Sequence, residues 1–205
     1  FCFALRKEIN KKGLASPEVL ETVQDIEKQA VRADEIIQKT RNYLKGKKQS
    51  AKVLVVQEAL ATATETFNVT LHKKAEICVQ CSKNSLYCLI DPLDFELIII
   101  NLLRNAYEAV QSAGTKPVIY VEVSSLGDYI SIAVEDNGLP VSESLLASLG
   151  KEPTSTKAEG LGLGLTIVTS LVENFGGNIT FTHSLTGGLK VIVKLPAVKG
   201  KIHDN

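Results

Sequence analysis

The sequence predicts an α+β fold, a two-layer α/β sandwich preceded by a helical segment. An apolar seam with heptad spacing runs through residues 19–44, and a short polar stretch then separates it from the rest of the chain. From residue 53 onward, helical apolar periods alternate with short runs of strand type, enough for one layer of each. The predicted borders are 1–45 for the helical segment, 46–52 for a linker, 53–198 for the sandwich and 199–205 for a tail.

The composition limits what the chain can bind. The 205 residues are 44% hydrophobic, which is enough to bury one good core and a smaller second unit. Lysine and arginine total 23, as do aspartate and glutamate, so no overall field attracts nucleic acid or an anionic membrane. Any anion site must therefore be local, and we expect no nucleic-acid partner.

The sequence shows no segment that would cross a membrane. Its most apolar run, Leu97 to Leu103, is interrupted by Asn101 and is far too short to span a bilayer. No signal peptide is visible, so we expect a cytoplasmic piece without direct membrane contact. The chain opens on Phe1 and contains no methionine, from which we expect a fragment of a longer chain or a processed product.

The first 45 residues predict two helices. Lys11-Lys12-Gly13 is typical of a helix end, and Ser16-Pro17-Glu18 is typical of a helix start. The apolar seam of the second helix consists of Val19, Val23, Ile26, Ala30, Ala33, Ile37, Thr40 and Leu44. Because one short partner helix cannot cover it, we expect a homodimer through residues 17–45; a lone hairpin folded on its own domain is the alternative.

The sandwich is predicted element by element from the same periodicities. Asp91-Pro92 is the clearest helix start, with an acidic N-cap and proline at the first helical position. Residues 137–160 are predicted to be irregular and longer than a structural connection needs, which is typical of a lid. The predicted helices are 53–66, 92–113 and the glycine-led segment to 175, and the predicted strands are 77–81, 87–90, 118–124, 129–136, 178–184 and 188–195.

Three cysteines fall close together, and His72 is near them. A Cys-x-x-Cys pair can hold zinc, but a complete site needs four convergent ligands. The predicted strand at 77–81 would point Cys78 and Cys81 to opposite faces. We therefore favour buried free thiols at Cys78, Cys81 and Cys88 over a zinc site.

Glycines at positions 160, 162 and 164 lead straight into an apolar helix. Without β-carbons a ligand can approach the backbone closely, and the unpaired N–H groups of a first helical turn attract phosphate. A tight turn is the alternative for such glycines.

Two further patterns carry polar groups where apolar ones are expected. Asn101, Asn105 and Glu108 form one stripe on a strongly apolar helix. A carboxamide oxygen suits Mg²⁺, although a hydrogen-bonded structural asparagine is the alternative. Asp136-Asn137-Gly138 follows a strand, where the carboxylate could accept from an exocyclic base amine; Asn-Gly alone is a turn signal.

Together and in this order, the three motifs resemble the N, G1 and G2 boxes of the GHKL ATP-binding family. They read Asn-Leu-Leu-Arg-Asn-Ala at 101–106, Glu-Asp-Asn-Gly at 135–138 and Gly-Leu-Gly-Leu-Gly at 160–164. Within the family, residues 50–197 resemble the catalytic domain of sensor histidine kinases. The heptad segment is similar to the second half of the dimerisation and phosphotransfer hairpin of the oxygen and nitrogen sensor type, here truncated.

The resemblance implies ATP and Mg²⁺ as ligands, with a role for each motif residue. Asn105 would coordinate Mg²⁺ beside Asn101, and Asp136 would bind the adenine amine, which Gly138 lets approach. Arg104 and Lys157 would place positive charge near the terminal phosphates, so the implied catalytic residues are Asn105, Lys157 and Arg104. The glycine box that would support the phosphates and the lid comprises Gly160, Leu161, Gly162, Leu163 and Gly164.

The sequence departs from the family pattern in three places. The only histidines are 72, 183 and 203, so the phospho-acceptor is absent and is expected upstream of Phe1. Pro140 stands where the family usually has a second glycine, which stiffens the first hinge of the lid. The lid reads Glu-Pro-Thr-Ser-Thr-Lys to Lys157, without the usual aromatic residues.

The resemblance implies transfer of the ATP γ-phosphoryl group to that upstream histidine and relay to a response regulator. An upstream sensor domain is a second implied partner. A GHKL ATPase is the alternative enzyme, but it needs a carboxylate base where this chain has Asn101, an amide. A degenerate domain that only binds ATP or dimerises is the non-enzymatic alternative.

Overall fold

The computed structural model describes residues 51–70, 76–114, 116, 118–150 and 163–198. The chain divides into two compact units, Phe1–Lys48 and Gln49–Asn205, and every described residue belongs to the second. The predicted helical segment at 1–45, its dimer through residues 17–45 and the tail lie outside the described residues. Their borders stay a prediction.

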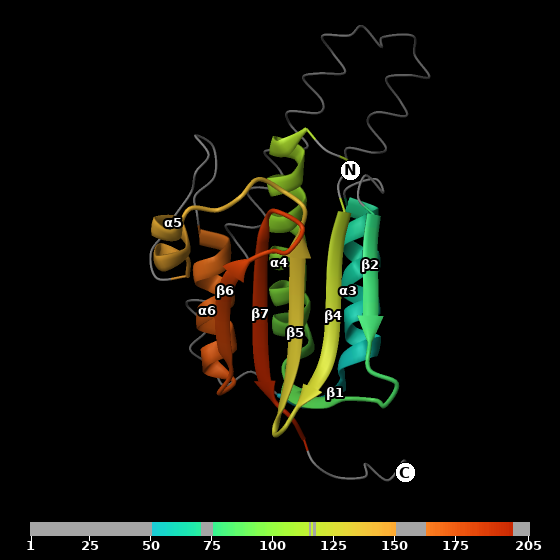
Figure 1. Ribbon diagram of the computed structural model, residues 1–205. Coiled ribbons are helices and arrows are strands. Elements are labelled where there is room, and N and C mark those ends of the chain that lie inside the picture. The colour runs from blue at the N-terminus through green and yellow to red at the C-terminus, as the bar shows by residue number, and fades with distance from the viewer. Residues whose placement is uncertain (1–50, 71–75, 115, 117, 151–162, 199–205) are drawn as a thin grey trace, which may run out of the picture. The chain divides into compact units, whose positions relative to one another are not determined.

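A five-stranded sheet forms one layer of the domain (Figure 1). The strands are β2 (Glu76–Cys81), β4 (Val118–Leu126), β5 (Tyr129–Asp136), β6 (Asn178–His183) and β7 (Leu189–Pro196). Their order across the sheet is β2-β4-β5-β7-β6. β2 runs parallel to β4, and every other neighbouring pair is antiparallel. β5 therefore lies at the centre of the sheet, with its end at Asp136.

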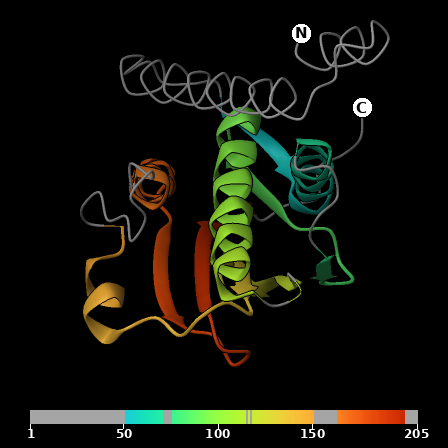
Figure 2. The same cartoon turned by 90° about the horizontal axis from the view of Figure 1, so that it is seen from above.

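Helices cover one face of this sheet (Figures 1 and 2). They are α3 (Val56–Thr70), α4 (Pro92–Ala113) and α6 (Leu163–Asn174), and α4 packs between the other two. A second, two-stranded sheet pairs β1 (Lys52–Val55) with β3 (Tyr87–Ile90). The predicted two-layer sandwich is confirmed. None of the helices that the structure describes is long and apolar enough to span a membrane.

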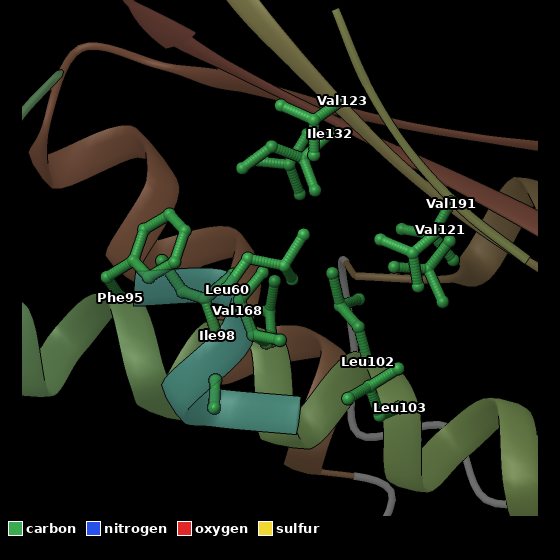
Figure 3. Close-up of a cluster of buried hydrophobic side chains, with 14 of the residues drawn as sticks. Leu60, Phe95, Ile98, Leu102, Leu103, Val121, Val123, Ile132, Val168 and Val191 are labelled. Carbon is green, nitrogen blue, oxygen red and sulfur yellow. The ribbon is translucent and has the colours of Figure 1, made fainter. Parts of the chain in front are cut away.

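The core lies between the two layers (Figure 3). Alternate residues of the central strands, such as Val121, Val123 and Ile132, point at apolar side chains of α4, such as Ile98 and Leu102. All of these side chains are buried. Burial of each side chain stabilises the fold by about 1.5–3 kcal/mol relative to an exposed position. The alternation of apolar residues therefore determines which face of the sheet packs against the helices.

The same alternation sets the direction of the last residue of β5. Ile130, Ile132 and Val134 are buried on the helix-covered face, and Asp136 continues their series. Its carboxylate therefore points toward the helical layer, whereas Glu135 points toward the open face of the sheet.

The long helix α4 is confirmed with its predicted cap. The side chain of Asp91 accepts hydrogen bonds from the backbone N–H of Leu93 at 2.9 Å and of Asp94 at 3.4 Å. Gly114 ends the helix in the left-handed conformation at φ 68°. Both ends are thus fixed by local sequence signals, which places Asn101 and Asn105 reproducibly along the helix.

Three sequence expectations were wrong in detail. The helix expected from residue 53 begins at Val56, because residues 52–55 pair with β3 instead. The expected irregular stretch contains a short helix, α5 (Glu143–Ser148), which Ser142 caps by accepting from Leu145 N at 3.3 Å. Gly164 lies inside the first turn of α6 and not before it.

The cysteines lie as the strand pattern predicts. Cys78 is paired across the sheet with Tyr120 and Cys81 with Val123, so their side chains point to opposite faces. Cys81 packs against the core, and burial raises its pKa. Cys88 is buried in β3, where burial raises the pKa of its thiol to about 12. All three are free thiols, but only Cys88 is fully buried. The expected burial was wrong for Cys78 and Cys81, which are half-buried because β2 lies at the edge of the sheet.

Candidate functional site

The first and third sequence motifs meet where α6 begins beside α4. A β-carbon at Gly164 would lie 3.3 Å from Oδ1 of Asn101 and 3.5 Å from both Oδ1 and Nδ2 of Asn105. These distances mean that the backbone of the last glycine of the motif touches the asparagine stripe. A methyl group here would be tight against Asn101 and in ordinary contact with Asn105, so a side chain longer than that of alanine would press on the two carboxamides.

The second motif approaches the same helix one turn further on. A β-carbon at Gly138 would lie 3.2 Å from the β-carbon of Ala109, which follows Asn105 by one turn of α4. It would also lie 2.7 Å from Oδ1 of Asp136, closer than real β-carbons come to other atoms. The end of β5 and the first turn of α6 therefore both contact α4, so the three motifs gather along one helix.

Asp136 is the most deeply buried acid of the described chain. Its side chain is 3% exposed, and its two oxygens accept from Gly138 N at 2.8 Å and from Leu189 N at 3.3 Å. Burial raises the pKa of Asp136 above its ordinary value, although these two backbone N–H groups act in the opposite direction. No cationic side chain within the described ranges pairs with it. A carboxylate has about four lone-pair directions, so acceptor capacity is left over.

Asn101 and Asn105 are held differently although they share one face of α4. Asn101 Nδ2 donates to the carbonyl of Leu97 at 2.8 Å, one turn back, which leaves its Oδ1 beside Gly164. Asn105 Nδ2 is buried and has no hydrogen-bond partner among the described residues. Such a group costs about 1–3 kcal/mol, and a native structure keeps one mainly where a ligand or a function uses it.

Arg104 lies between these two asparagines in sequence and is partly buried. Burial lowers the pKa of its guanidinium group, and the negative charge of Glu108 raises it. Lys157, Gly160, Leu161 and Gly162 lie outside the described residues, as do the contacts of the Leu163 side chain. Their predicted roles stay predictions.

Comparison with known proteins shows the family. The sequence model for the histidine kinase-, DNA gyrase B- and HSP90-like ATPases matches residues 90–199, which is more than half of the chain. The chain belongs to this ATPase family. The match spans α4, β5 and α6, the elements that carry the three motifs. The resemblance inferred from the motifs is thereby confirmed.

The curated relatives are sensor kinases. The chain is 31% identical to sporulation kinase B of Bacillus subtilis over 159 residues, which is 76% of this chain and 37% of that protein. It is 30% identical to the C4-dicarboxylate transport sensor protein DctS of Rhodobacter capsulatus, over 82% of this chain and 26% of that protein. The chain therefore spans only about a third of the length of these relatives.

Solved structures share the fold. The catalytic domain of histidine kinase ThkA superposes with a TM-score of 0.64 at 23% identity, covering 72% of this chain and 96% of that one. Full-length ShkA, in complex with AMPPNP, superposes with a TM-score of 0.70 at 20% identity over 90% of this chain and 40% of that one. The sheet and its helical layer are thus those of histidine kinase catalytic domains.

Asn137 of the second motif has a structural place in this ATPase domain. Its Oδ1 accepts from Val118 N at 3.1 Å, and its Nδ2 donates to the carbonyl of Lys116 at 3.1 Å. The side chain thus ties the end of β5 to the start of β4. The two neighbouring residues of this motif therefore have different roles. Asp136 points into the candidate site, and Asn137 holds the strands together.

The turn between β6 and β7 was not among the predicted site residues. Gly188 lies so close to Asp136 that a β-carbon there would overlap the carboxylate, and a β-carbon at Gly187 would lie 3.3 Å from the carbonyl of Gly138. Thr186 Oγ1 also donates to the backbone carbonyl of Asp136 at 3.1 Å. The consecutive glycines were the one signal in the sequence that a close backbone approach was needed here.

Proposed function

We propose that this chain is the ATP-binding catalytic part of a sensor histidine kinase, which transfers the γ-phosphoryl group of ATP to a histidine upstream of Phe1. Membership of the ATPase family and the sensor-kinase relatives support the proposal. The observation that carries it is Asp136, a buried carboxylate without a cationic partner among the described residues, against which Gly138 and Gly188 pack closely.

Asp136 fits the adenine base. An adenine presents an exocyclic amine, which donates to a carboxylate, whereas a guanine presents a carbonyl oxygen at that position and would repel it. Because Asp136 is buried, a hydrogen bond to it excludes water and contributes more than one at the surface. Gly138 would let the base approach, and the lack of a side chain at Gly188 leaves the space that the carboxylate itself occupies.

Asn105 fits a magnesium ion bound together with phosphate. An amide nitrogen cannot ligate Mg²⁺, so the metal would be held by Oδ1 of Asn105, with Asn101 Oδ1 on the same side of α4. The buried Nδ2 of Asn105, which has no partner among the described residues, would donate to a phosphate oxygen. Mg²⁺ at this position would neutralise charge on the phosphate oxygens. Gly160, Leu161, Gly162, Leu163 and Gly164 would offer backbone N–H groups to the phosphates. Arg104 and Lys157 would add positive charge near the transferred group.

The presence of Asn101 favours phosphoryl transfer to a protein side chain over hydrolysis of ATP. Activation of a water molecule needs a general base within reach, and an amide cannot accept the proton. Of the three histidines, the structure describes His183, whose Nε2 lies 3.0 Å from Glu143 Oε1 in a contact between β6 and α5. The acceptor histidine would come from the dimerisation hairpin, with residues 17–45 as the homodimer contact. A response regulator would then receive the phosphoryl group in the cytoplasm, under control of an upstream sensor domain.

Radiolabelled ATP tests this proposal. The chain alone should remain unlabelled and release little phosphate. Mixed with Mg²⁺ and a hairpin that carries the proposed histidine, it should label the hairpin, and a response regulator should then remove the label. Lys157→Ala should slow the labelling far more than it weakens ADP binding, because its charge would act at the terminal phosphate. Rapid phosphate release by the chain alone would favour an ATPase instead.

A further inference from the structure

We propose that Glu135 is a positioning residue, which holds the turn at residues 184–188 against Asp136 and thereby sets ATP affinity from the opposite face of the sheet. The inference rests on the proposed ATP site. Glu135 and Asp136 are consecutive in β5, so their side chains point to opposite faces. Glu135 therefore does not face the helix-covered side, and any effect it has on the nucleotide passes through other residues.

Three donors converge on the carboxylate of Glu135. Oε1 accepts from Ser184 Oγ at 2.8 Å and from Leu185 N at 3.0 Å, and Oε2 pairs with Lys190 Nζ at 3.2 Å. The Glu135 side chain is only 13% exposed. Burial alone would raise its pKa, but these hydrogen bonds and the charge of Lys190 hold the pKa of Glu135 below its ordinary value. The group is thus an ionised anchor that binds the start of the turn, at Ser184 and Leu185, and Lys190 of β7 just beyond it.

Hydrogen bonds within the turn connect Glu135 to the backbone of Asp136. Ser184 Oγ, which donates to Glu135, accepts from Thr186 N at 3.0 Å and lies 2.7 Å from Thr186 Oγ1. Thr186 Oγ1 donates to the carbonyl of Asp136 at 3.1 Å. A connected set of hydrogen bonds therefore runs from the outer face of the sheet, through the turn, to the backbone of the proposed adenine acceptor.

A backbone bond from Ser184 N to the carbonyl of Gly188 at 2.9 Å closes the turn but does not tie it to β5. Leu189 N reaches Asp136 Oδ2 at 3.3 Å, and Gly187 N reaches the carbonyl of Ser184 at 3.4 Å. Gly187 adopts φ 121°, and two consecutive glycines give the backbone little preference of its own. Strand pairing and the bond between Ser184 and Gly188 set the shape of the turn, and Glu135 adds the charge-assisted bonds that hold it against β5 beside Asp136.

Glu135 is also reachable from the open face of the sheet. It lines a groove of about 530 Å³ together with Tyr120, Glu122, Leu185, Thr186 and Lys190. None of the motif asparagines or glycines lines this groove. The anchor and the proposed nucleotide site thus lie on different faces, which allows them to be altered separately.

The test measures binding of ATP, adenosine and Mg²⁺-tripolyphosphate by calorimetry. Glu135→Ala should weaken ATP and adenosine by the same factor, about tenfold, and leave tripolyphosphate unchanged, because only the base would lose its partner. Glu135→Gln keeps an oxygen that can accept from Ser184 and Leu185 N, so it should restore part of the affinity. Glu122→Ala, an exposed glutamate on the same face, is the matched control and should bind like the parent.

A double-mutant cycle separates positioning from general damage. In an Asp136→Asn background, Glu135→Ala should cause no further loss, since the group that it positions is already altered. Additive losses, or parent-like affinity of Glu135→Ala in a parent that binds ATP, would overturn this inference alone. A parent that does not bind ATP would overturn the proposed function as well. If Glu135→Ala does not fold, Glu135→Gln replaces it in the double-mutant cycle, with the same expected outcome.

Discussion

The α-carbon of Gly188 lies directly against the carboxylate of Asp136, so a β-carbon at residue 188 would overlap an oxygen of that carboxylate. Asp136 ends β5, and Gly188 is the last residue of the turn before β7, the strand that pairs with β5. Glycine is thus required at 188 by space alone, because its φ does not lie in the left-handed range.

Gly188→Ala should therefore displace Asp136 and abolish measurable ATP binding. Gly127→Ala is the matched control, because Gly127 has φ 61° in the turn between β4 and β5 and a β-carbon there meets nothing within 4 Å. That control should lose about 1 kcal/mol of stability through backbone strain and still bind ATP. Calorimetry and thermal unfolding of both variants measure the difference. Unchanged ATP affinity in Gly188→Ala would contradict the proposed geometry.

ATP binding should weaken as pH falls through the raised pKa of Asp136. Burial favours the neutral form, so the folded protein takes up this proton at a higher pH than the unfolded chain does. The contribution of Asp136 to stability therefore becomes more favourable with falling pH, while the protonated carboxyl loses an acceptor oxygen for adenine. Titrations of ATP affinity against pH should show this acid limb in the parent and lack it in Asp136→Asn. The same acid limb in both proteins would assign it to another group.

Asn105 should matter for the metal and not for the fold. Its Nδ2 is buried without a partner among the described residues, so Asn105→Leu removes a penalty of about 1–3 kcal/mol. We expect this variant to be at least as stable as the parent in urea, while ATP affinity no longer depends on Mg²⁺. Asn101→Leu is the comparison, since it breaks the bond to the carbonyl of Leu97. Retention of metal dependence in Asn105→Leu would make Asn105 a structural residue.

Asn137 should behave in the opposite way to Asn105. Asn137→Ala removes its bonds to Val118 N and to the carbonyl of Lys116, which should cost about 1–3 kcal/mol of stability. Because the side chain faces the scaffold, ATP affinity should stay within about twofold of the parent. Loss of about 1.4 kcal/mol of binding free energy would instead lower the affinity tenfold. Denaturation and calorimetry on one preparation measure both quantities. A variant that keeps its stability and loses ATP would place Asn137 in the site.

Elements with local signals could be predicted from the sequence. Asp91 and Pro92 mark the start of α4, and alternating apolar residues mark β4 and β5, because caps and strand faces depend on near neighbours. The strand β1 could not be predicted, since residues 53–55 suit a helix equally well and become a strand only by pairing with β3.

Some residues of the candidate site could also be predicted from the sequence, and others could not. The motif residues Asn105, Asp136 and Gly164 were found because their type and spacing are specific to the family. The role of Glu135 and its partner Ser184 were not predicted, because their bond joins positions that are 49 residues apart and the strand order that brings them together has no local signal. Long-range contacts of this kind depend on the packing of the whole sheet.

The central claim is that Asp136 recognises the adenine of ATP, and calorimetry of Asp136→Asn tests it most directly. The substitution keeps the size of the side chain and removes its charge. A hydrogen bond to a charged group contributes about 1.5–3 kcal/mol, so ATP affinity should fall roughly ten- to hundredfold, with reduced preference for ATP over GTP. Equal ATP affinity in Asp136→Asn and the parent would contradict the account.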